Sequence, residues 1–302
     1  MSTERPAPLM DPDMNWVAVL EHHARRTPDR PVAVCGDEVV TYRQMVDRAA
    51  AMAAGLAERG IVQGDVVGLL SYNNVEFMIT LFAANHLGAI AMPVNWRLAP
   101  AEVRYILDHS GARVLVCHRD LLGVGVEATV DWAHDRVRVC IGDEAPSGWE
   151  AFASMCGSMI PPRVSSSGDD IHRLMYTSGT TGHPKGVMIT HANLAWKNFA
   201  HVTEFGFTSD DVGLACGPLY HVGALDLVTT SMLAVGATTV IHRVFDAEQV
   251  VDEIERSGVT VVWAAPAMLR AILELAGVDN RDLSSVRVII AGGEKLPVPF
   301  VE

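Results

Sequence analysis

Apolar and polar positions along the chain follow two periods that alternate with each other. Apolar residues three and four positions apart, typical of one face of a helix, recur in the longer segments. Short β-branched apolar runs bounded by turn residues, typical of strands, lie between them. In the first half this pattern predicts helices over 16–26, 42–59, 74–87 and 99–110, and strands over 32–35, 39–42, 65–70, 89–94, 114–117 and 136–141.

A second alternating stretch begins after residue 168. It predicts strands over 187–190, 238–241, 259–263 and 286–291, helices over 191–202, 247–257 and 267–275, and an apolar segment over 225–233. Strands that alternate with helices of this length are joined by crossover connections. The expected fold class is therefore α/β with mostly parallel sheets.

The segment 142–168 has little periodicity, several prolines and a serine run, which is typical of a connecting region. A chain of 302 residues also exceeds what one hydrophobic core usually organises. We expect a flexible tail over 1–14, a first α/β subdomain over 15–168, and a second over 169–302, with their sheets packed together.

Charge and cysteine content narrow the function classes. With 23 Lys and Arg against 36 Asp and Glu, the formal net charge is −13, which disfavours binding to nucleic acid. Five scattered cysteines fit neither a disulfide framework nor a zinc cluster. We expect no signal peptide and no transmembrane segment, and hence a cytoplasmic location.

The segment 176–186 carries the clearest candidate chemistry, and it reads YTSGTTGHPKG. Its glycines let backbone N–H groups converge, its four hydroxyl side chains add donors, and Lys185 supplies a positive charge, which together suit a polyphosphate. It differs from a Walker loop because residues 187–190 read as a strand instead of opening a helix. The alternative is a flexible surface loop between two strands.

This segment resembles the signature loop of the adenylate-forming (AMP-binding) superfamily, which includes acyl-CoA synthetases. Weaker similarities in family order lie at 39–42, 64–67, 88–95 and 291–296. The resemblance implies that the loop grips the β and γ phosphates of ATP while a carboxylate attacks the α phosphorus. It assigns Thr177 a place near Mg²⁺, Lys185 a catalytic role, and phosphate contacts to Thr177, Ser178, Gly179, Thr180, Thr181, Gly182 and Lys185.

The segment 218–223, PLYHVG, is similar to the aromatic-histidine motif of acyl- and aryl-CoA synthetases. By this resemblance His221 is catalytic and lies beside the substrate carboxylate, and Tyr220 and Gly223 also contact the substrate. Amino-acid-activating members carry an aspartate near this position, so amino-acid adenylation ranks last. The alternative is a packed histidine after a turn.

The segment 289–297 resembles the family strand and loop that contact adenine and the acyl group. The resemblance assigns such contacts to Gly292, Gly293, Glu294 and Lys295. Many acyl-CoA synthetases have Ala-Pro where this chain has Glu294 and Lys295, so an ordinary strand followed by a Gly-Gly turn is the alternative for those two side chains.

Together these similarities imply the N-terminal portion of an acyl-CoA synthetase that uses ATP, Mg²⁺ and coenzyme A on a fatty or related hydrophobic carboxylic acid. Family members continue with further motifs and a mobile C-terminal domain, which we expect to be missing here and to be supplied in cis or in trans. We therefore expect the 302-residue chain to be a poor catalyst alone. The alternatives are a non-catalytic nucleotide- or acyl-binding remnant, and an acyl-AMP ligase that acts without coenzyme A.

Overall fold

The computed structural model describes residues 13–133, 135–142, 144–157, 159–177 and 183–293. The strands are β1 Pro31–Cys35, β2 Glu38–Thr41, β3 Val66–Leu70, β4 Ile90–Pro93, β5 Val114–His118, β6 Val137–Ile141, β7 Glu150–Ala151, β8 Ile171–Thr177, β9 Lys185–Thr190, β10 Val212–Ala215, β11 Thr238–Ile241, β12 Val261–Ala264 and β13 Val288–Ala291. The α-helices are α1 Val17–Arg26, α2 Tyr42–Glu58, α3 Val75–His86, α4 Pro100–His109, α5 Leu122–Ala128, α6 His191–Phe205, α7 Thr230–Val235, α8 Ala247–Ser257 and α9 Pro266–Leu273.

Shorter helical turns complete the described chain. They are the 3₁₀ turns Arg119–Leu121, Phe152–Met155 and Val278–Asn280, and a π-helix, η3, over Gly223–Thr229. The structure confirms the predicted alternation of helices and strands. It adds β7, β10 and α5, which the pattern did not indicate, and it resolves the apolar segment 225–233 into η3 followed by α7.

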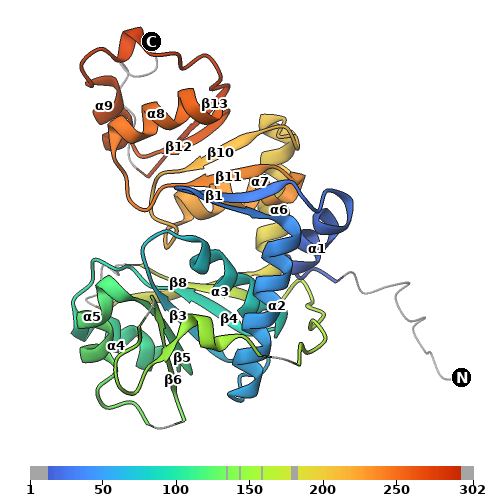
Figure 1. Cartoon of the computed structure of the whole chain (residues 1–302), viewed down its shortest axis with the longest axis vertical. Helices are drawn as coiled ribbons and strands as arrows, with labels where there is room; N and C mark the ends of the chain where they lie inside the picture. The colour runs from blue at the N-terminus through green and yellow to red at the C-terminus, as the bar shows by residue number, and fades with distance from the viewer. Residues whose placement is uncertain (1–12, 134, 143, 158, 178–182, 294–302) are drawn as a thin grey trace, which may run out of the picture.

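The strands form two sheets, which Figure 1 shows one above the other. Sheet A has the order β13-β12-β10-β11-β1-β2, and sheet B has the order β7-β6-β5-β3-β4-β8-β9. The pairs β1–β2 and β8–β9 are antiparallel, and every other described pair is parallel. The expected α/β class with mostly parallel sheets is therefore confirmed.

Both sheets draw strands from both halves of the chain. The early hairpin β1–β2 joins sheet A through β11, and the later hairpin β8–β9 joins sheet B through β4. Sheet membership thus crosses the division expected at residue 168, which stays a prediction about folding units. One consequence is that the stems of the glycine-rich loop belong to the sheet built mainly from the first half.

Helix α3 is buried on every side because it lies between the sheets and contacts β1 of sheet A as well as β3 and β4 of sheet B. Its start is fixed by Asn74, whose side chain accepts a hydrogen bond of 2.7 Å from the Phe77 N–H. The neighbouring helix α2 begins with a capping box between Thr41 and Gln44. These caps explain why both helices begin where the pattern predicts.

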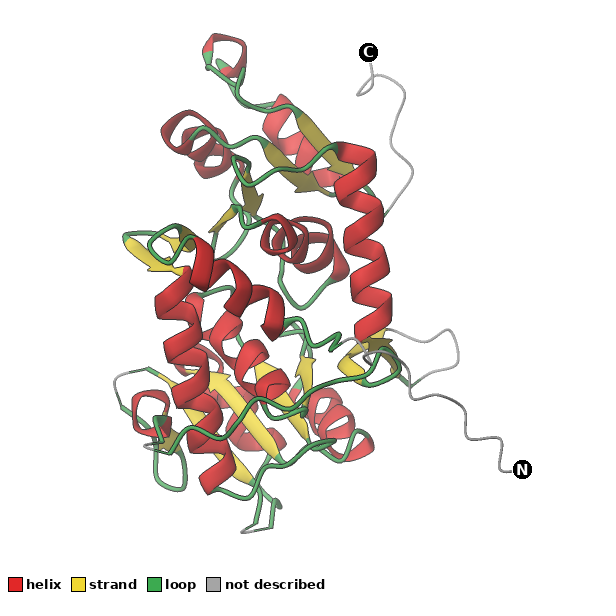
Figure 2. Ribbon diagram, turned by 90° about the vertical axis from the view of Figure 1, so that its right-hand side faces the viewer, coloured by secondary structure: helices red, strands yellow, loops and turns green. Residues whose placement is uncertain are grey.

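Packing divides the molecule into layers of helix, sheet, helix, sheet and helix, which Figure 2 shows from the side. The central core joins α2 and α3 to the inner faces of both sheets. A second cluster packs α4 against the outer face of sheet B, and a third packs α8 and α9 against the outer face of sheet A. Buried parallel sheets covered on both faces account for the almost continuous apolar strands of the sequence.

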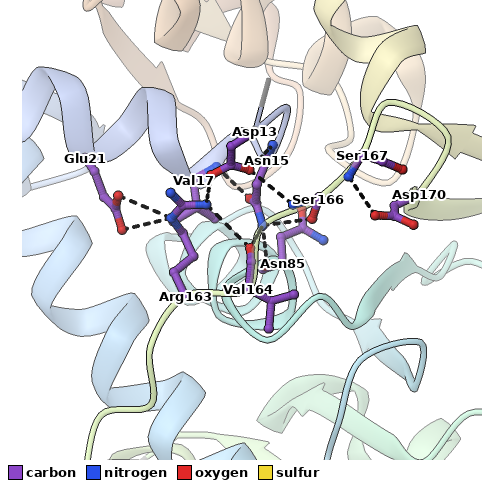
Figure 3. Close-up of polar contacts among 10 residues, drawn as sticks. All are labelled: Asp13, Asn15, Val17, Glu21, Asn85, Arg163, Val164, Ser166, Ser167 and Asp170. Atoms are coloured by element: carbon purple, nitrogen blue, oxygen red, sulfur yellow. Dashed lines mark hydrogen bonds and ion pairs between the residues drawn. The ribbon is translucent and has the colours of Figure 1, made fainter. Parts of the chain in front are cut away.

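A polar network of Asp13, Asn15, Glu21, Arg163 and Ser166 fixes the connecting segment to the rest of the molecule; we call it the N-terminal clamp (Figure 3). Asn15 Nδ2 donates to the Asn85 carbonyl at 2.7 Å, to the Val164 carbonyl at 3.0 Å and to Ser166 Oγ at 3.2 Å. Arg163 forms ion pairs with Asp13 and Glu21. The segment expected to be a plain connection is therefore tied to α1 and to the end of α3.

Two expectations from the sequence concern membrane spans and disulfides. No helix in the described part of the chain is long and apolar enough to cross a bilayer. The five cysteines are all free.

Candidate functional site at the carboxyl edges of the two sheets

Most of the predicted site residues that the structure describes lie at or beyond the carboxyl ends of strands, whereas Lys185 begins β9. In sheet A the strands β10, β12 and β13 run parallel, so the segments that follow them leave at one edge. In sheet B, β4 and β8 are also parallel, and β8 ends at Thr177. Crevices beside the carboxyl ends of parallel strands are the usual ligand-binding positions of open α/β sheets.

Asn73 joins the two edges. It follows β3 of sheet B and is buried, and its Nδ2 donates to the carbonyl oxygens of Gly217 at 2.8 Å and His242 at 2.9 Å, both in sheet A connections. Its Oδ1 accepts from the Leu219 N–H at 2.8 Å. One amide thus fixes the turn that leads into Tyr220 and His221.

The stems of the glycine-rich loop place Thr177 and Lys185 opposite each other. These residues are partners across the antiparallel pair β8–β9, and both are exposed. Lys185 begins a strand, which confirms that no helix follows the loop directly. The predicted phosphate contacts Ser178, Gly179, Thr180, Thr181 and Gly182 lie outside the described residues.

A stack of rings supports these stems from helix α4. Tyr105 stacks on His109 with ring centroids 5.4 Å apart and on His183 with centroids 5.1 Å apart. His109 Nδ1 lies 2.8 Å from Tyr176 Oη, and burial raises the pKa of Tyr176. The sequence interpretation missed this support, although the i, i+4 spacing of Tyr105 and His109 on a predicted helix could have indicated it.

In the turn after β10, Tyr220 and His221 differ in their exposure to solvent. Tyr220 is buried and packs edge-on against Trp96, with ring centroids 6.4 Å apart, while His221 is exposed. The His221 N–H donates to the Pro218 carbonyl at 3.1 Å, which closes the turn. His221 is therefore no packed core histidine, and its ring is open to a ligand.

Two glycines leave room for Trp263 of β12. A Cβ atom at Gly223 would come within 2.3 Å of the indole, and one at Gly217 within 2.5 Å. No side chain fits at either position without moving the ring. The structure thus gives Gly223 a packing reason to be glycine, beside its predicted contact with the substrate.

Gly292 and Gly293 follow β13 at the same edge of sheet A. Gly293 has φ of 97°, a conformation that favours glycine, and among the described residues a Cβ atom at Gly292 or Gly293 would meet nothing within 4 Å. The neighbouring predicted contacts Glu294 and Lys295 lie outside the described residues.

Comparisons with known proteins agree with this geometry. The sequence profile of a family described as "AMP-binding enzyme" matches residues 20–302. A feruloyl-CoA synthase from Amycolatopsis sp is 35% identical over 274 residues, which are 91% of this chain and 53% of that protein. An indoleacetate–CoA ligase from Aromatoleum aromaticum is 33% identical over 281 residues, 92% of this chain and 55% of that protein.

Solved structures give the same picture. The anthranilate CoA ligase AuaEII in complex with anthranoyl-AMP superposes with a TM-score of 0.88 at 28% identity, over 95% of this chain and 56% of that one. The inhibitor-bound N-terminal domain of FACL13 from Mycobacterium tuberculosis gives a TM-score of 0.84 at 30% identity, over 96% and 72% of the two chains. The chain spans about half the length of the curated relatives it matches.

Proposed function

The chain belongs to the AMP-binding enzyme family of adenylate-forming acyl-CoA ligases, and from this premise we propose that it is the N-terminal part of an ATP-dependent acyl-CoA synthetase. The enzyme would activate a hydrophobic carboxylic acid as an acyl-adenylate, release pyrophosphate, and pass the acyl group to the thiol of coenzyme A. The observation that carries the proposal is the pairing of Thr177 with Lys185, the two residues that bracket the glycine- and hydroxyl-rich segment in the sequence.

The residues present fit a triphosphate. Lys185 and the hydroxyl of Thr177 are exposed at adjacent positions, so a charged donor and a neutral donor can reach the same phosphate oxygens. Within the described ranges no three His, Cys, Asp or Glu side chains converge on a metal-sized site. Mg²⁺ would be held in part by phosphates and water, with Thr177 nearby, which is its common mode of binding in nucleotide sites.

On the acid side, His221 would lie beside the substrate carboxylate and hold it toward the α phosphate. Tyr220, fixed by Trp96, would form part of the acyl wall. Asp226 is the nearest carboxylate along the chain, but it is buried and paired with Arg173, so it is not free to hold an ammonium group. This pairing argues against amino-acid activation and for a simple acid.

An aromatic acid is the first candidate for the substrate. Relatives named for feruloyl, indoleacetate and 4-coumarate, and a structural neighbour named for anthranilate, all carry aromatic acyl groups. A fatty acid is the second candidate, because a fatty acid–[acyl-carrier-protein] ligase, ScoC from Streptomyces coeruleorubidus, is 32% identical over 95% of this chain. The same relative supports the alternative that the thiol acceptor is a carrier protein instead of coenzyme A.

ATP–pyrophosphate exchange across a panel of ferulic, indoleacetic, anthranilic and palmitic acids and the common amino acids tests the proposal. It should be measured for the 302-residue chain and for the chain extended by the coding sequence that follows it. We expect the extended protein to respond to at least one aromatic or fatty acid and the shorter chain to be at least about 100-fold slower, because catalytic groups supplied by other parts of such enzymes are worth that much. A response to amino acids alone would overturn the acyl-CoA assignment, and full activity of the 302-residue chain would overturn the need for a further domain.

A further inference from the structure

A buried group of charges lies between the loop stems and the helix that follows His221; we call Arg173, Lys197 and Asp226 the charge cluster. Arg173 is in β8, four residues before Thr177, and is fully buried, and its guanidinium forms an ion pair with the Asp226 carboxylate. Lys197 is in α6, which follows β9, and its Nζ donates to the Asp226 backbone carbonyl. The residues that flank the loop on both sides thus bind the same residue of the π-helix η3.

The helix at this point has an unusual hydrogen-bond register. The Thr230 N–H donates to the carbonyl of Leu225, five residues earlier, where an α-helix would use the residue four earlier. Side-chain hydroxyls also bind carbonyl groups of this helix. Thr229 Oγ1 donates to the Ala224 carbonyl at 2.9 Å, and the hydroxyls of Thr230 and Ser231 lie 3.1 and 3.2 Å from the Asp226 carbonyl oxygen.

Lys197 completes this arrangement from outside the helix. Its Nζ lies 2.7 Å from Thr230 Oγ1 and 3.2 Å from Ser231 Oγ, in addition to its contact with the Asp226 carbonyl. In the α register the Thr230 N–H, which now donates to Leu225, would donate to the Asp226 carbonyl at which the amine is bound. An amine held by three oxygens at this turn therefore favours the π register.

The register matters because η3 begins two residues after His221. One residue more or less in a helical turn rotates the preceding segment by about 100° relative to the following one. A change to the α register would therefore turn His221 away from its present direction while α7 stayed in place. Gly223 would turn with it, against the Trp263 indole that it now accommodates.

The charge cluster contributes little net free energy to the stability of the fold. Within the part of the chain that the structure describes, Arg173 Nε and Nη1 and Asp226 Oδ1 are buried without hydrogen-bond partners. Desolvating such charges costs free energy that the ion pair repays only in part, and apolar side chains of similar size often serve stability as well or better. This desolvation cost is explained if the cluster fixes the orientation of the π-helix η3.

We propose that Arg173 and Lys197 are positioning residues that hold the π-helix, and through it His221, in a fixed relation to the two stems of the loop. That Thr177 and Lys185 bind phosphates and His221 binds the acid rests on the proposed function. The contacts of Arg173 and Lys197 with the π-helix do not. In the complete enzyme the cluster would keep the acid carboxylate, beside His221, aligned with the phosphates held at Thr177 and Lys185.

The test compares Lys197→Met with the unaltered chain in two measurements. The first is a crystal structure of each, in which we expect the variant to lose the five-residue bond from Thr230 to Leu225 and to move His221 relative to Thr177. The second is calorimetric binding of Mg·ATP and of feruloyl sulfamoyl adenosine, a stable acyl-adenylate analogue. We expect the variant to bind Mg·ATP within twofold of the unaltered chain and the analogue at least tenfold more weakly.

Two further variants keep the test decisive. Lys197→Gln retains a hydrogen-bond donor without the charge. It takes the place of Lys197→Met if Lys197→Met does not fold. If both variants fold, Lys197→Gln should lose less affinity for the analogue than Lys197→Met. Asn15→Ala removes hydrogen bonds that go to Asn85, Val164 and Ser166 and to no member of the charge cluster, so it should lower stability and leave the register and both affinities unchanged. If neither protein binds a nucleotide, the proposed function fails, and the crystal structures alone decide the inference. An unchanged register and His221 position in the Lys197 variant would overturn it.

Discussion

Two polar networks link segments that are far apart in the sequence, and they differ in how completely their atoms are paired. The N-terminal clamp pairs Asn15 with two carbonyls and a hydroxyl and Arg163 with two carboxylates (Figure 3). The charge cluster is more deeply buried, yet both Arg173 and Asp226 retain unpaired polar atoms.

This difference distinguishes a network that stabilises the fold from one that fixes the orientation of a helix. A satisfied clamp over a connecting segment gives its full hydrogen-bond energy to stability. A buried and partly unpaired cluster gives little net stability, but it makes any other arrangement of its members more costly still. Loss of the clamp should therefore lower stability alone, whereas removal of both members of the Arg173–Asp226 pair should change stability little.

Removing one partner of the buried ion pair should give the largest effect. Arg173→Met leaves the Asp226 carboxylate buried without its cation, so we expect the free energy of unfolding to fall by about 3–5 kcal/mol in denaturant titrations. The double variant Arg173→Met with Asp226→Leu removes both charges and should recover most of that loss. A loss below about 1 kcal/mol in the single variant would show that the pair is not desolvated in solution.

Breaking the clamp should have a smaller effect, on stability alone. Asn15→Ala removes the hydrogen bonds that Asn15 Nδ2 donates to the Asn85 and Val164 carbonyls and to Ser166 Oγ, and we expect a loss of about 2–3 kcal/mol in the free energy of unfolding. Affinity for the acyl-adenylate analogue should stay within twofold. If Asn15→Ala weakened analogue binding and left stability unchanged, the proposed difference between the two networks would be wrong.

A third expected effect is a pH dependence from Lys197. Burial lowers its pKa to about 7, although Asp226 opposes this, while an unfolded chain keeps a lysine protonated to about pH 10.4. Of the other groups that face it, Arg173 also lowers its pKa, and burial lowers the pKa of His172 and His201, so both imidazoles are neutral above pH 7.

Between pH 7 and pH 10 the unfolded chain therefore binds one more proton at Lys197 than the folded chain. Stability should rise with pH over this window, by at most about 1.4 kcal/mol per pH unit. Thermal or denaturant unfolding of Lys197→Met at several pH values should lack this rise. Parallel pH profiles for the two proteins would show that the amine titrates near its ordinary value.

Much of the fold could be predicted because periodicity is a local property. Strand β10 was missed because it is four residues long and carries Gly213, at which a Cβ atom would come within 2.6 Å of Met232 and Val228. The exchange of hairpins between the sheets was also missed, because pairing partners lie far apart in the chain and strand patterns do not name them.

The candidate site shows the same limit. The loop 176–186 could be identified because its chemistry lies in consecutive residues. The charge cluster could not, since Arg173, Lys197 and Asp226 come from three elements and each has an ordinary surface interpretation by itself. Only the packing of α6 and η3 beside β8 brings these side chains together.

The central claim, that the loop and its stems hold the phosphates of ATP, is tested most directly by calorimetric titration of Mg·ATP into the unaltered chain and into Lys185→Ala. Lys185 is an exposed residue at the end of a strand, so its removal should change the free energy of unfolding by less than about 0.5 kcal/mol. Loss of one charge-assisted contact to phosphate should weaken ATP binding by about 10- to 100-fold. Equal affinity for Mg·ATP in the two folded proteins would contradict the claim.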